Sequence, residues 1–156
     1  MIETPQIVQT ETQLIAFIPL VVAREDIQIV MGPGIQEVFA AIQAQNLSPT
    51  GPWFTHHNKR PDTHFDFKIC VPIAKAIQPV GRVEAGELKA TTVARSIYQG
   101  PYEELHKAWP ELLEWVETNG HHRREDLWEC YVVCPQPGLN IEPSAYRTEL
   151  NQPLLS

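Results

Sequence analysis

The sequence predicts an α+β fold in which a strand-helix-strand-strand unit occurs twice. Two observations lead to this prediction. A Gly-Pro pair opens each of two helical patterns, and strand-like segments flank both patterns in the same order. We expect pseudo-repeats 1–80 and 81–156 to form a single domain over residues 1–156. Its antiparallel sheet would carry two helices on one face, with a ligand cleft between the halves.

The first half starts with a long strand-like segment, residues 6–22. Gly32-Pro33 is predicted to open the helix, because proline at the first helical position loses only an N–H that would be unpaired anyway. The helix ends before a turn at residues 48–51, and residues 52–57 and 65–73 are predicted strands. The apolar stripe of the helix consists of Ile35, Val38, Phe39 and Ile42.

The helix of the second half is predicted to start at Gly100-Pro101 and to stop at Asn119-Gly120. Its irregular residue is Pro110, which lacks a backbone donor and should kink the helix just after Trp109 or split it. The buried stripe consists of Leu105, Trp109, Leu112 and Val116.

Three strands are predicted around this second helix. Residues 88–99 precede it, and residues 127–134 and 146–154 follow it. Residues 81–87 are then expected to connect the two halves.

Composition and charge exclude several functions. Hydrophobic residues make up 43% and charged residues 20% of the chain, which argues against disorder. The excess of 19 acidic over 12 basic residues gives a net charge of −7, so we expect no direct binding to nucleic acid. Residues 14–22 are too few to span a membrane, and no signal peptide stands out. Three cysteines fit a reduced compartment, so the expected location is the cytoplasm.

No metal ion or cofactor is expected. The pairs His56-His57 and His121-His122 and the cysteines form none of the ligand spacings of zinc sites. The sequence also contains no glycine loop for phosphate groups and no nucleophile elbow.

Glu129 is the most informative residue, because its carboxylate interrupts the apolar run 127–134. In a strand, Glu129 and Tyr131 would share one face, and apolar residues occupy both faces. An unpaired carboxylate is costly in such surroundings. Its charge could be paired with an internal arginine such as Arg95 or Arg147, removed by a proton, or paired with a cationic ligand that enters a cleft.

Short motifs occur in a characteristic order along nearly the whole chain. They are Gly51-Pro52-Trp53-Phe54, Val71-Pro72-Ile73, residues 81–88, Ala94-Arg95, Gly100-Pro101-Tyr102, Ala108-Trp109, Trp128-Glu129-Cys130-Tyr131, Arg147-Thr148-Glu149-Leu150 and Pro153-Leu154. No single motif is specific, but the ordered set resembles the GyrI-like small-molecule-binding domain. This effector-binding domain is also attached to some AraC-type and MerR-type bacterial regulators. No DNA-binding segment accompanies the motifs here, so the chain resembles the free-standing type.

The resemblance implies halves that flank a cleft, in which a glutamate at the position of Glu129 pairs with lipophilic cations among aromatic side chains. The expected ligand-binding residues are Glu129, Tyr131, Tyr102, Phe54, His56, Tyr146 and Trp109. Each ring face would attract a cation by about 0.5 to 2 kcal/mol. Core packing is the alternative role for Tyr131 and Trp109, and solvent exposure is the alternative for His56.

The leading functional hypothesis is therefore a binding protein, a monomer or homodimer, that senses or sequesters lipophilic cations such as dyes, quaternary ammonium compounds or drug-like heterocycles. The alternative is a hydrolase, because some GyrI-like proteins hydrolyse strained cyclopropane-containing natural products. Glu129 would then act as general base on water, with Tyr131 or Tyr102 orienting it. A third hypothesis is a protein-binding module, in the manner of a gyrase inhibitor, that uses the acidic exterior.

Overall fold

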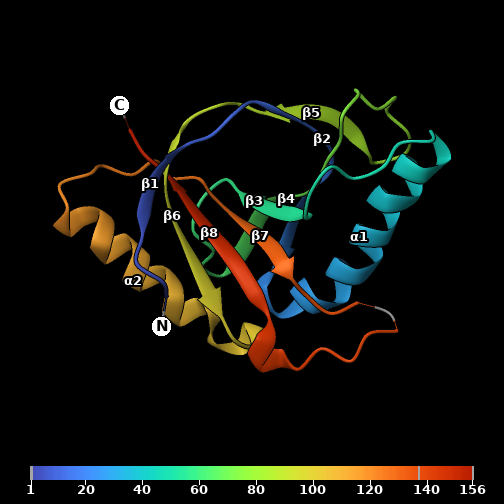
Figure 1. Ribbon diagram of the computed structural model, residues 1–156. Coiled ribbons are helices and arrows are strands. Elements are labelled where there is room, and N and C mark those ends of the chain that lie inside the picture. Colours follow the sequence, from blue (N-terminus) through green and yellow to red (C-terminus); the bar gives the residue numbers. More distant parts are fainter. Residues whose placement is uncertain (1, 137, 156) are drawn as a thin grey trace. The chain divides into compact units, whose positions relative to one another are not determined.

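The computed structural model of the protein describes residues 2–136 and 138–155. The chain divides into two compact units. The middle unit comprises residues 11–90, and the terminal unit comprises residues 1–10 and 91–156. Each unit is a four-stranded antiparallel sheet with one helix, which confirms the α+β prediction (Figure 1).

The middle unit has the strand order β3-β4-β2-β5, and its helix α1 packs against β2 and β4. Val38 and Ile42 of α1 meet Ile18, Phe67 and Ile69 of the sheet in a fully buried core. The elements are β2 (Gln13–Ala23), the 3-10 turn η1 (Arg24–Asp26), α1 (Ile27–Ala44), β3 (Phe54–His57), β4 (His64–Pro72) and β5 (Glu84–Leu88).

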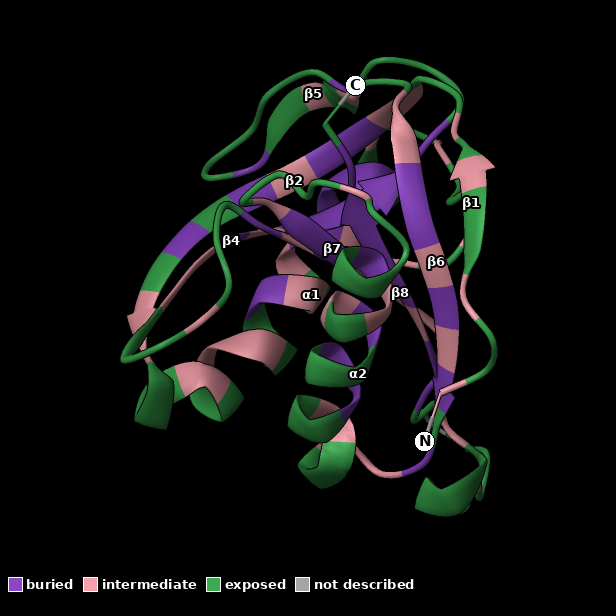
Figure 2. Ribbon diagram, turned by 90° about the vertical axis from the view of Figure 1, so that its left-hand side faces the viewer, coloured by how far each residue is buried: buried purple, intermediate pink, exposed green. Residues whose placement is uncertain are grey.

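The terminal unit has the strand order β1-β6-β8-β7, and α2 lies along β6 and β8 (Figure 1). The stripe of α2 that includes Leu112 and Val116 packs on Ala94 and Leu150, while the opposite side of the helix is exposed (Figure 2). The elements are β1 (Gln6–Gln9), β6 (Thr92–Gln99), η2 (Tyr102–Glu104), α2 (Leu105–Thr118), β7 (Leu127–Val133), η3 (Pro143–Ala145) and β8 (Arg147–Pro153).

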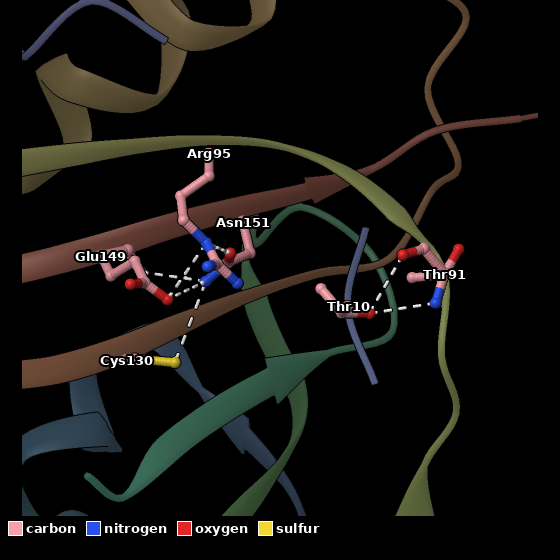
Figure 3. A network of polar contacts seen from close by, with 6 residues as sticks. All are labelled: Thr10, Thr91, Arg95, Cys130, Glu149 and Asn151. Carbon is pink, nitrogen blue, oxygen red and sulfur yellow. Dashed lines mark hydrogen bonds and ion pairs between the residues drawn. The ribbon is translucent and has the colours of Figure 1, made fainter. Parts of the chain in front are cut away.

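The predicted strand 6–22 is two strands that belong to different units. β1 pairs with β6, whereas β2 pairs with β4 and β5. The chain leaves the terminal unit after Thr10, whose backbone and hydroxyl group both bond Thr91 at 2.8 to 3.0 Å (Figure 3). No glycine or proline marks this break, so the local pattern did not reveal it.

The predicted connector 81–87 is also partly strand, because β5 starts at Glu84 and pairs with β2. The boundaries between the two units therefore lie after residues 10 and 90, and not at residue 80. That the two pseudo-repeats act as a single domain stays a prediction.

Proline does not start α1 as predicted. The helix begins at Ile27, and Pro33 lies inside it. Val30 and Met31 pack on the core of the middle unit, so burial extends the helix through the proline. The hydrogen bond that Pro33 removes would have ended on the carbonyl of Ile29, a residue that is 70% exposed.

Pro110 does not split α2, which runs without a break from Leu105 to Thr118. The buried Trp109 and Leu112 on either side of the proline hold the helix against the sheet. Pro101 precedes η2 and α2, so it lies at the predicted start of this helical segment. Among the helices of the described residues, none is long and apolar enough to cross a membrane.

Candidate ligand-binding site

Glu129 lies on β7 and accepts two short hydrogen bonds. Its Oε1 accepts from the indole Nε1 of Trp109 at 2.6 Å, and its Oε2 accepts from the hydroxyl group of Tyr131 at 2.7 Å. Strand alternation puts Glu129 and Tyr131 on one face of the sheet, as predicted, and α2 brings Trp109 to the same face. Both carboxylate oxygens therefore have a neutral donor.

Trp109 combines two roles. Its side chain is only 6% exposed and packs with Ala108 and Leu112 in the core of the terminal unit. Its indole N–H nevertheless points to Glu129. A buried indole usually finds a hydrogen-bond partner, so the core packing expected from the helical stripe also positions the carboxylate.

Two further tyrosines extend the site. The ring of Tyr102 in η2 stacks on Tyr146 with centroids 5.0 Å apart and meets the ring of Tyr131 edge-on at 6.0 Å. The backbone N–H of Gly100 donates to the carbonyl of Tyr146 at 2.9 Å, which joins the start of η2 to the start of β8. We call Tyr102, Trp109, Glu129, Tyr131 and Tyr146 the Glu129 cluster.

Tyr102 remains a neutral phenol in this cluster. Burial is the main cause that raises the pKa of its hydroxyl group above the usual value. The negative charges that Cys134, Tyr146 and Glu129 carry when ionised raise this pKa further. The Tyr102 ring can therefore face a cation without carrying a charge of its own at neutral pH.

Arg95 does not neutralise Glu129, contrary to one of the alternatives considered from the sequence. Its Nε donates to Oδ1 of Asn151 at 2.7 Å and lies 3.4 Å from Oε1 of Glu149 (Figure 3). Arg95 is opposite Asn151 in the strand register, and Asn151 is opposite Trp128, so these side chains share the face away from Glu129.

Arg147 is also engaged elsewhere. Its guanidinium group donates to Oε2 of Glu3 and to Oε1 of Gln99, both at 3.0 Å. Over the part of the chain that the structure describes, Glu129 forms no ion pair. Its carboxylate is held by hydrogen bonds, but no cationic side chain of the described residues pairs with it.

The remaining two nominated residues lie in the middle unit. Phe54 and His56 are both on β3, opposite Cys70 and Lys68 of β4. Phe54 is buried at 2% exposure, and His56 is half-buried. The structure thus gathers five of the seven nominated residues in the Glu129 cluster, and their role in binding stays a prediction.

Thr148 lies beside this cluster and was not among the ligand-binding residues predicted from the sequence. It lies on β8 directly opposite Tyr131 and is 0% exposed. Its hydroxyl group has no hydrogen-bond partner among the described residues. Because Thr148 follows Tyr146 by two positions, the alternation of a strand could have placed it on the same face as the nominated tyrosine.

A family model for the GyrI-like small molecule binding domain matches residues 3–153. The chain therefore belongs to the GyrI-like family, in agreement with the resemblance of its motifs. No curated protein matches the sequence significantly.

Solved structures share the fold. The crystal structure of the EcmrR C-terminal domain matches with a TM-score of 0.84 and 20% identity, over 97% of this chain and 97% of that chain. In the cryo-EM structure of an EcmrR–DNA complex, the match has a TM-score of 0.83 and 20% identity. It covers 97% of this chain, which spans only 57% of that EcmrR chain.

Two other matches carry functional descriptions. The structure of SAV2435 bound to tetraphenylphosphonium has a TM-score of 0.64 at 12% identity and covers 98% of this chain and 94% of that chain. A hydrolase from Listeria innocua has a TM-score of 0.66 at 12% identity and covers 97% and 91%. At these identities the matches show the fold alone.

Proposed function

We propose that this GyrI-like protein binds lipophilic or amphipathic cationic small molecules at the Glu129 cluster, and so senses or sequesters them. One observation carries the proposal. Glu129 is a half-buried carboxylate with two neutral donors and no ion pair among the described residues.

The electrostatics favour a cation over other ligands. Hydrogen bonds from Trp109 and Tyr131 reduce the cost of burying the carboxylate but leave its negative charge in place. A cationic ligand would balance this charge, and the rings of Tyr102 and Tyr146 would add cation–π attraction of about 0.5 to 2 kcal/mol each. An anionic ligand would be repelled.

A structural neighbour supports the same ligand class. SAV2435 is described as bound to tetraphenylphosphonium, a lipophilic cation, and shares the fold over 98% of this chain. We further propose that the protein works in the cytoplasm, where its three cysteines stay reduced, as a monomer or homodimer without direct contact to nucleic acid.

The test is a titration of tetraphenylphosphonium, followed by calorimetry, into the wild type, Glu129→Gln and Glu103→Gln. Glu103 is exposed in the same helical turn as Tyr102, so its substitution changes the net charge equally at a solvent-facing position. We expect Glu129→Gln to weaken binding at least 10-fold, about 1.4 kcal/mol or more, and Glu103→Gln to leave the Kd within twofold. Equal affinity of the wild type and a folded Glu129→Gln, or no binding to the wild type, contradicts the proposal.

A second candidate function is hydrolysis of strained, electrophilic rings in cyclopropanoid natural products. The observation that favours it is the 2.7 Å hydrogen bond between Tyr131 and Glu129, together with a neighbour described as a hydrolase. Glu129 would take a proton from water as the water oxygen attacks a ring carbon. The ring C–C bond would break, its electron pair would pass to the conjugated acceptor of the substrate, and that acceptor would take up a proton.

Mass spectrometry of a cyclopropanoid substrate incubated with the protein separates the two functions. A hydrolase converts the substrate to a product heavier by one water, and Glu129→Gln abolishes this conversion. A binding protein returns the substrate unchanged.

A further inference from the structure

Glu129 has capacity for further hydrogen bonds. An ionised carboxylate offers about four lone-pair sites, and Trp109 and Tyr131 each occupy one. The carboxylate can only accept, so any further bond must come from a donor on the ligand. A cation without N–H or O–H groups would leave these sites unused.

Thr148 adds a second polar group on the same face. Glu129 is opposite Leu150 and Tyr131 is opposite Thr148, so Thr148 is the diagonal neighbour of Glu129 across β7 and β8. Diagonal neighbours on one face of an antiparallel pair lie about 7 to 8 Å apart at Cα, so the side chains of Glu129 and Thr148 are close neighbours on this face.

The two in-register neighbours of Thr148 direct their hydroxyl protons elsewhere. Tyr131 donates to Glu129 at 2.7 Å, and Tyr98 donates to the carbonyl of Pro101 at 2.8 Å. The fully buried Thr148 hydroxyl thus has no partner among the residues that the structure describes. Buried hydroxyl groups are nearly always hydrogen-bonded, and valine would fill the same space without this cost.

We propose that the Glu129 cluster selects protonated amines, whose charged nitrogen carries N–H groups, over fully substituted quaternary cations, and that Thr148 is a specificity residue for this choice. This inference rests on the proposed function. The N–H groups of the ligand donate to Glu129 and to Oγ1 of Thr148. A quaternary centre offers only its charge to Glu129 and leaves Thr148 unpaired. Since Thr148 is fully buried, the side chains that cover it move when the ligand binds.

A matched pair of ligands tests the inference. The first is a phenothiazine with a dimethylaminopropyl chain, which is protonated at pH 7, and the second is its N-methylated quaternary derivative. Calorimetry gives the Kd of both for the wild type, Thr148→Val, Thr148→Ser and Glu129→Gln. Thr148→Val keeps the shape and removes the hydroxyl group, whereas Thr148→Ser keeps the hydroxyl group.

We expect the wild type and Thr148→Ser to bind the protonated amine at least 10-fold more tightly than the quaternary ion. Thr148→Val should reduce this preference at least threefold without changing the Kd of the quaternary ion. Equal affinity for both ligands, or the same preference in wild type and a folded Thr148→Val, overturns the inference. If either of these outcomes occurs but Glu129→Gln binds neither ligand, the inference fails while the proposed function is still supported. If neither ligand binds the wild type, both proposals fail.

Discussion

Glu129 and Glu149 lie in one sheet, on the neighbouring strands β7 and β8, but on opposite faces. Both are half-buried. Glu149 has a cationic neighbour in Arg95 and accepts a hydrogen bond from Asn151. The side chain of Glu149 is 22% exposed, and that of Arg95 is 32% exposed. Among the described residues, Glu129 has the neutral donors Trp109 and Tyr131 and no ion pair.

This difference separates a structural carboxylate from a candidate binding carboxylate. The protein balances the charge of Glu149 itself, so that charge serves the folded state. The charge of Glu129 is stabilised by two hydrogen bonds but forms no ion pair within the described residues, and the proposed cation binding rests on this difference. Substitutions on each face of the sheet therefore test the two carboxylates separately.

Arg95→Met should remove the ion pair on the Glu149 face of the sheet. The substitution leaves Glu149 without its cation and removes the bond to Asn151, so we expect a loss of about 2 to 3 kcal/mol in the free energy of unfolding. This loss is smaller than for a fully buried charge, because both side chains are partly exposed and solvent screens the charge of Glu149. Urea denaturation measures the loss. Arg147→Met, which breaks a more exposed ion pair with Glu3, is the control and should cost less than about 1 kcal/mol.

Cation binding by Arg95→Met should stay within twofold of the wild type, because Arg95 lies on the face away from Glu129. A parallel loss of binding in a folded Arg95→Met would show that the two faces are not independent.

Gly100→Ala should disturb the Glu129 face. Gly100 has φ of +145°, and a Cβ there would lie 2.7 Å from the Tyr98 hydroxyl group, which bonds Pro101 just before Tyr102. We expect a loss of about 1 to 3 kcal/mol in stability and weaker cation binding. Gly120→Ala is the matched control, with φ of +77° but no atom within 4 Å of the added Cβ. Thermal denaturation should give a lower Tm for Gly100→Ala than for Gly120→Ala, and the reverse order of Tm values would contradict this explanation.

Alkaline pH should reduce the stability that Tyr102, on the Glu129 face of the sheet, contributes to the protein. The pKa of Tyr102 is raised by burial above its unfolded value of about 10, so the unfolded chain loses this proton first as the pH rises. Its contribution to stability is complete below about pH 10 and declines above it, by less than the limit of about 1.4 kcal/mol per pH unit because solvent screens a half-buried group. Urea denaturation from pH 9 to 11 should show a smaller decline for Tyr102→Phe than for the wild type. Identical pH profiles would exclude this role of Tyr102.

Thr148→Val should have the smallest effect and the opposite sign. Removing a buried hydroxyl group without a described partner should leave the ligand-free protein equally stable or stabilise it by up to about 1 kcal/mol. Asn151→Leu, on the Glu149 face, should destabilise the protein, because Asn151 accepts a hydrogen bond from Arg95 and donates one to Glu149. Destabilisation by both substitutions in urea would mean that Thr148 has a hydrogen bond in solution.

Local patterns in the sequence were sufficient for the elements around the site. Strand alternation placed Glu129 with Tyr131, and helical spacing identified the buried residues Trp109 and Leu112 of α2. These predictions succeeded because side-chain direction within an element depends on its own periodicity. Pro33 misled the same reasoning, since burial of neighbouring apolar residues outweighed a single missing hydrogen bond.

The sequence by itself determined the α+β class, the family and the isolated carboxylate at position 129. Only the tertiary structure decided that β1 and β2 belong to different units and that Arg95 pairs with Glu149 rather than Glu129. It also revealed the buried hydroxyl group of Thr148 beside the site. The physical reason is that charge pairing and burial depend on which strands become neighbours. Contacts between residues far apart in the chain decide this, whereas local periodicity does not.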